Sequence, residues 1–228
     1  MALTSAQLHY SIINDVVANG RAPHLSVLAS RYHVMPEEMQ KGLRQLADDR
    51  GVVLHPDNDE IWAIHPFSLA PTNFTVRAGA KVWWGNCAWC SLGIAALIGG
   101  EVTISSTLGG EGQPVSVTVR DGTVEDSNLV VHFPIPMQHI WNNVIYSCST
   151  MLFFESETEV RSWCFRHGIV IGDVRSIDTV ARFAGDWYGR HRDKDWQKWT
   201  VAEARELFAR HGLSGQIWEL PDGDDTRF

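Results

Sequence analysis

Two cysteines, Cys87 and Cys90, stand three positions apart directly before an apolar stretch, and this arrangement limits the possible fold more than any other feature. The residues from Leu92 to Ile98 predict an apolar helix, so we expect Cys90 at or just before its N-terminus. Free N–H groups and the helix dipole stabilise a thiolate there and lower its pKa. A third cysteine, Cys148, can complete a soft-metal site if the fold brings it close.

The four cysteines, at positions 87, 90, 148 and 164, also permit other interpretations. They do not resemble the disulfide framework of a small secreted domain. A zinc ribbon needs a second CxxC pair, and a thioredoxin-like site needs a βαβ unit, whereas a β-meander is predicted after Cys90. All four can instead be small core residues, which is a common role of free cysteine. Cys164 fits that role best, because no other thiol is near it in the sequence.

Residues 1–66 have a winged-helix-like outline of three helices and a β-hairpin. Thr4 with Gln7 forms a capping-box pattern and Gly20 suits the end of the first helix. A second helix is predicted over 25–32 and a third from Pro36, while 52–54 and 61–64 predict the hairpin. Acidic residues on the third helix disfavour DNA binding. We therefore interpret residues 1–66 as an accessory packing domain.

Residues 67–228 predict a second domain with a mostly antiparallel or mixed sheet and flanking helices, so the fold class is α+β. Residues 67–80 are expected to form a linker that leads into an edge strand. Strands are expected in a meander over 101–106, 114–120 and 128–133, and a fourth over 144–154, which contains Cys148. Capping pairs predict helices from Ser156 to Gly168 and from Thr200 to Gly212. The acidic tail, 221–228, is expected to be loose.

Charge and hydropathy narrow the possible partners. The net charge is −8 with no block of basic residues, so no nucleic-acid partner is expected. No segment is long and apolar enough for a membrane span, and the N-terminus lacks a secretory signal, so we expect a cytoplasmic protein without a membrane partner. The ten histidines lack metal-motif spacing. Trp83, Trp84 and Trp89 are expected in the core, or as the walls of an apolar pocket.

Three segments resemble the organomercurial (alkylmercury) lyases: AWCSLGIAALIGGEVTISST at 88–107, GQPVSVTV at 112–119 and YSCSTMLFF at 146–154. The resemblance covers about 67–168, and the outline of residues 1–66 also matches the family's accessory domain. It implies that Cys90 and Cys148 bind the mercury of a small organometallic substrate, with Hg(II) as the product and no required cofactor. It also implies an Asp three residues after the first cysteine, acting in protonation of the carbon. Gly93 occupies that position here.

The leading hypothesis is a carbon–mercury lyase in which Cys90 and Cys148 capture mercury and a general acid protonates the leaving carbon. Because Gly93 cannot transfer a proton, Cys87 is a candidate third thiol and proton donor. The alternatives are a non-catalytic protein that binds Hg, Cu or Zn through Cys87, Cys90 and Cys148, and a homologue acting on an unrelated substrate. The sequence carries no sign of the oligomeric state.

Overall fold

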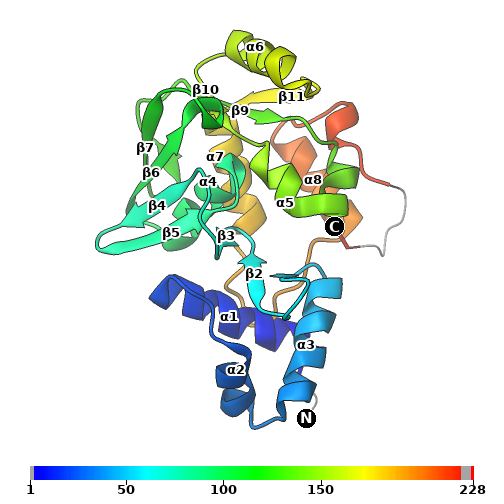
Figure 1. Ribbon diagram of the computed structural model, residues 1–228. Helices are drawn as coiled ribbons and strands as arrows, with labels where there is room; N and C mark the ends of the chain where they lie inside the picture. Colours follow the sequence, from blue (N-terminus) through cyan, green and yellow to red (C-terminus); the bar gives the residue numbers. More distant parts are fainter. Residues whose placement is uncertain (1–2, 222–226) are drawn as a thin grey trace.

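The computed structural model describes residues 3–221 and 227–228 (Figure 1). Three helices form one end of the molecule, and α6 lies at the other end. The N-terminal region consists of α1 (Ser5–Asn19), α2 (Leu25–Tyr32), α3 (Pro36–Asp48), β1 (Val53–Leu54) and β2 (Ile61–Ile64). Local signals explain α1 and α3, since the Thr4–Gln7 capping box is formed, Gly20 is left-handed and Pro36 begins α3.

The large sheet is antiparallel and has the strand order β1-β2-β3-β5-β4-β6-β7-β8. Its further strands are β3 (Phe67–Ser68), β4 (Thr75–Ala78), β5 (Lys81–Gly85), β6 (Glu101–Thr107), β7 (Pro114–Arg120) and β8 (Thr123–Val124). The N-terminal hairpin is part of this sheet, because β2 pairs with β3. Alternate residues of β6, Val102, Ile104 and Ser106, are buried, as expected for a strand with one face on the core.

Helix α4 (Ala88–Ile98) packs between the large sheet and α7 (Ile177–Tyr188). Every residue of α4 from Ala88 to Ala95 is buried, so its apolar character on all sides matches its central position. The sequence predicted the helix but placed its start near Leu92. The fold is α+β, with antiparallel sheets and helices packed against them.

A second sheet corrects two expectations. It has the order β10-β9-β11 and is formed by β9 (Val130–Phe133), β10 (Phe153–Phe154) and β11 (Asp173–Ser176). The predicted strand 128–133 therefore does not extend the meander. The predicted strand 144–154 was also wrong, because residues 144–149 form the helix α5 (Val144–Ser149) and only β10 is extended. The Asn143 side chain accepts a hydrogen bond from the Tyr146 N–H and caps α5. This cap favours a helix here, although β-branched residues in the segment suggested a strand.

The C-terminal region contains α6 (Glu157–His167), α7 and α8 (Val201–Arg210), and short 3₁₀ helices occur at Leu108–Gly110, Met137–Asn143 and Gln216–Trp218. The predicted starts of α6 and α8 are confirmed by their Ser156 and Thr200 caps. Most of the tail expected to be loose, residues 222–226, lies outside the described residues. Phe228 is buried against Trp187. No described helix has the length and apolar character that a membrane span needs.

Candidate thiol site

Cys87 and Cys90 lie in the first turn of α4. Cys87 is the N-cap residue, and its sulfur accepts the backbone N–H of Cys90 at 3.2 Å. Cys90 is the third residue of the helix, where backbone N–H groups have no partner within the helix. The sequence thus located the thiols correctly relative to a helix N-terminus, although that helix begins four residues earlier than expected.

Cys148 comes from α5 and His65 from the turn between β2 and β3, and both reach the start of α4. The backbone N–H of Ala88 donates to the carbonyl of Met151 at 3.0 Å, so the start of α4 is bound to the segment that follows α5. The sulfur atoms of Cys90 and Cys148 and a ring nitrogen of His65 all lie within 4.8 Å of one another. The His65 Nε2 is 3.7 Å from the Cys148 sulfur. A single soft ion can therefore contact all three side chains after small adjustments.

The described residues place His65, rather than Cys87, in this cluster of mutually close ligand atoms. Cys87 remains in contact with the other thiols through hydrogen bonds to Cys148 and Cys90. Cys164 is also buried, but its sulfur lies 3.6 Å from His132, in a different part of the core. The structure therefore brings three of the four cysteines together.

A small cavity of about 20 Å³ adjoins the cluster and has room for about one water molecule. Its walls include the aromatic rings of Trp89, Trp141, Trp187, Tyr188 and Phe228. Two buried ring nitrogens at this cavity, Trp89 Nε1 and His65 Nδ1, have no protein hydrogen-bond partner. Of the three tryptophans considered in the sequence, only Trp89 is a wall residue. Trp83 instead packs on Phe67 and donates to the Val16 carbonyl.

The thiols differ in their readiness to ionise. Burial alone would raise the pKa of Cys90, but hydrogen bonds from the Cys148 and Cys87 thiols lower it. His65 and the Tyr188 hydroxyl act in the same direction, and the pKa of Cys90 lies well below its ordinary value. The pKa of Cys87 is raised, mainly by burial. Hydrogen bonds with Cys87 and Cys90, and then burial, raise the pKa of Cys148. Cys90 is thus the thiol that ionises most readily among the three.

Two further ionisable groups border the cavity. Burial lowers the pKa of His65 to about 4, although the charge on Cys90 opposes this effect, so the imidazole is neutral near pH 7. Burial and the charge of Arg50 lower the pKa of Lys198 to about 7, while the charges of Cys90 and Cys148 act to raise it. The Lys198 ammonium lies 4.2 Å from the centre of the Trp141 ring. No carboxylate of the described residues lies within ion-pair distance of Lys198.

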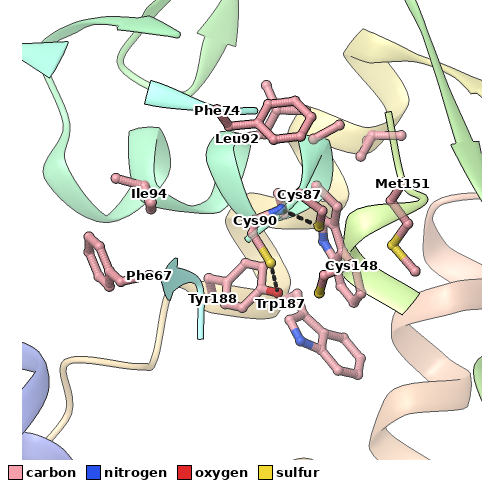
Figure 2. Packing of buried hydrophobic residues seen from close by; sticks show 14 of the residues in the cluster. Phe67, Phe74, Cys87, Cys90, Leu92, Ile94, Cys148, Met151, Trp187 and Tyr188 are labelled. Atoms are coloured by element: carbon pink, nitrogen blue, oxygen red, sulfur yellow. Dashed lines mark hydrogen bonds between the residues drawn. The ribbon is translucent and has the colours of Figure 1, made fainter. Parts of the chain in front are cut away.

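Gly93 and Tyr188 occupy adjoining positions on α4 and α7. A methyl group built on Gly93 would overlap the Tyr188 ring and approach its Cε2 to 2.8 Å. The Tyr188 hydroxyl lies 3.4 Å from the Cys90 sulfur, and Figure 2 shows this contact beside Cys148 and Trp187. The missing side chain at position 93 therefore leaves the space that the Tyr188 ring fills.

The sequence interpretation missed His65, Tyr188 and Lys198. None belongs to a recognisable motif, and each reaches the cavity from a segment distant from Cys90. Gly93 was a weak signal for Tyr188. A glycine where the family resemblance implies an acidic residue indicates that another side chain takes the space of the missing one.

The site thus combines a buried pair of thiols, an imidazole and several aromatic rings, and such a thiol pair is suited to binding a soft metal ion. The chain belongs to the alkylmercury lyase family, whose model matches residues 67–189. Among solved structures it is similar to the mercury-bound form of MerB2, with a TM-score of 0.63 and 20% sequence identity over 80% of this chain and 91% of that chain. This likeness shows the shared fold. A search of curated proteins found no match.

Proposed function

We propose that this protein cleaves the mercury–carbon bond of a small organomercurial and releases a hydrocarbon and thiolate-bound Hg(II). The observation that carries the proposal is the cluster in which the sulfur atoms of Cys90 and Cys148 lie within 4.8 Å of each other, and the lowered pKa of Cys90 supports it. Family membership supports the same chemistry.

The thiol pair suits this reaction because mercury is a soft metal that binds thiolates in preference to oxygen ligands. The Cys90 thiolate takes up the organomercury cation first. Cys148 then forms a second sulfur–mercury bond as the mercury–carbon bond breaks, and the proton lost by its thiol balances the proton gained by the carbon. The neutral imidazole of His65 provides a third contact to the mercury. No oxidant or reductant is required.

Cys87 has a defined structural task in this proposal, since its sulfur caps α4 through the Cys90 N–H. We also retain it as a candidate third thiol that supplies a proton, because it hydrogen-bonds to Cys148. Cys87→Ser keeps an oxygen that can cap the helix but removes the thiol. Unchanged turnover and mercury affinity in this variant would exclude a chemical role for Cys87.

The direct test incubates reduced protein with phenylmercury and excess small thiol in heavy water and measures benzene by mass spectrometry. We expect catalytic release of benzene that carries one deuterium, and loss of turnover by more than about 10²-fold in Cys90→Ser. Cys164→Ser, which changes a buried thiol outside the cluster, is the matched control and should retain turnover. Wild-type protein that releases no benzene would contradict the proposal.

A second function, soft-metal binding without catalysis, is favoured by one observation. None of the described residues that line the cavity carries a carboxylate, and position 93 is glycine, so an acid of the expected type is missing. In that case Cys90 and Cys148, with Cys87 or His65, would hold Hg(II), Cu(I) or Zn(II). Stoichiometric mercury retention without benzene would support this function, and neither retention nor benzene would indicate an unrelated substrate.

A further inference from the structure

The proposed cleavage leaves the origin of the carbon's proton to be explained, and the cavity offers few groups that can pass it on. The thiol of Cys148 gives up a proton when it binds mercury. A group that can relay this proton to the leaving carbon would complete the reaction. General acids work only within hydrogen-bond reach of the proton's destination.

Of the cavity's ionisable side chains outside the thiols, Tyr188 is the one with a contact to Cys90, at 3.4 Å from hydroxyl oxygen to sulfur. His65 has its hydrogen-bond contact with Cys148, from Nε2 to sulfur at 3.7 Å, although its ring nitrogen also lies within 4.8 Å of the Cys90 sulfur. The Lys198 ammonium lies over the Trp141 ring, where its contact is with the aromatic face. Tyr188 therefore has the hydroxyl group that lies closest to the sulfur proposed to bind the organomercury group.

The packing around Tyr188 fixes this position. Its side chain is almost fully buried, its ring lies 5.5 Å from that of Trp89, and it fills the space above Gly93. A side chain at position 93 would overlap the ring and force it to shift from this position. The position of the Tyr188 ring therefore depends on the absence of a side chain at Gly93.

We infer that Tyr188 is a catalytic residue that delivers the proton to the leaving carbon, an inference that rests on the proposed function. Its hydroxyl proton goes to the carbon as the mercury–carbon bond breaks, and its oxygen takes up the proton released by the Cys148 thiol. One C–H and one Hg–S bond form, one Hg–C and one S–H bond break, and the phenol ends neutral. Because a buried phenolate is costly, both transfers belong to one step.

Tyr188→Phe tests this inference while keeping the ring over Gly93. We expect benzene release from phenylmercury to fall by about 10²-fold or more, as is typical for loss of a general acid. Stoichiometric binding of phenylmercury should be retained, because both thiols remain. Tyr146→Phe, on α5 with an exposed side chain, is the matched control and should leave both quantities unchanged.

The outcomes separate the two proposals. If the wild-type protein is active and Tyr188→Phe stays within about threefold of it, the role of Tyr188 is overturned while the lyase function stands. If the wild-type protein releases no benzene, the lyase function fails and the inference falls with it. Circular dichroism and phenylmercury binding show whether the variant is folded, so a loss of turnover with binding intact supports the inference.

Discussion

At the scale of single residues, the Gly93–Tyr188 contact is a packing constraint as well as a proposed catalytic arrangement. Gly93 lies in the middle of a helix, where glycine costs about 1 kcal/mol relative to alanine. The cost is offset here because the Tyr188 ring occupies the space of a Cβ atom. Helix propensity and packing therefore favour opposite residues at this position, and packing decides it.

Gly93→Ala should lower the free energy of unfolding by about 1–3 kcal/mol, because the added methyl group overlaps the buried Tyr188 ring. Urea denaturation measures this change. Gly185→Ala on α7 is a matched control, since its added Cβ would meet only Ala96 at 4.0 Å. The control should gain about 0.5–1 kcal/mol from helix propensity. Equal effects of the two substitutions would contradict the packing argument.

We expect His65 to change the coordination of bound mercury more than the affinity for it. With His65→Ala, Hg(II) should still bind to the two thiols but lose a nitrogen contact. X-ray absorption at the mercury edge should therefore report two sulfur ligands and one nitrogen in the wild type and sulfur ligands alone in the variant. A nitrogen contact that persists in the variant would exclude His65 as the ligand.

At the scale of elements, the start of α4 combines a helix cap with a reactive thiol. The Cys87 sulfur satisfies the N–H of Cys90, and Ser91 Oγ donates to the Cys87 carbonyl at 2.8 Å. This network fixes the first turn before any substrate binds. The Cys90 sulfur therefore meets its partners with little loss of conformational freedom.

Cys87→Ala should cost about 1 kcal/mol of stability, because the helix loses its N-cap acceptor in a buried position. Cys87→Ser should cost less, since serine is a strong N-cap residue. Thermal or urea denaturation of both variants provides the comparison. If alanine and serine destabilise the protein equally, the capping role of the sulfur is excluded.

At the scale of the whole molecule, buried histidines join the N-terminal helices to the remainder of the chain. His9 of α1 stacks on Trp196 with ring centres 3.6 Å apart and lies 5.7 Å from His191. No ring nitrogen of His9 or His191 has a protein partner. Burial, with the charge of Lys198, lowers the pKa of His9 well below 6.5, and burial has the same effect on His191.

These histidines make stability depend on pH. The unfolded chain takes up protons near the ordinary histidine pKa of 6.5, whereas the folded protein does so only at lower pH. The free energy of unfolding should therefore be greatest above this value and fall as the pH decreases from about 7 to 5. Urea denaturation across this range measures the slope. His9→Phe, which keeps a ring against Trp196, should flatten the slope, and an unchanged slope would contradict the assignment.

The sequence predicted those features that depend on neighbouring residues. It predicted the start of α3 at Pro36, the thiols at the beginning of an apolar helix, and the helix caps at Thr4, Ser156 and Thr200. Each of these features is set by hydrogen bonds or dipoles within one helical turn. The resemblance of residues 88–107, 112–119 and 146–154 to one family was likewise present in the sequence, and the family model confirms it.

Only the tertiary structure decided which residues surround the thiols. Cys148 was expected in a strand but lies in α5, and His65 reaches it across 83 positions. Tyr188 is 98 positions from Cys90, and its place depends on a missing side chain on another helix. Such contacts follow from how buried surfaces fill space, and no local pattern records them. The sequence by itself determined the thiols and their helix, and packing determined their imidazole and phenol partners.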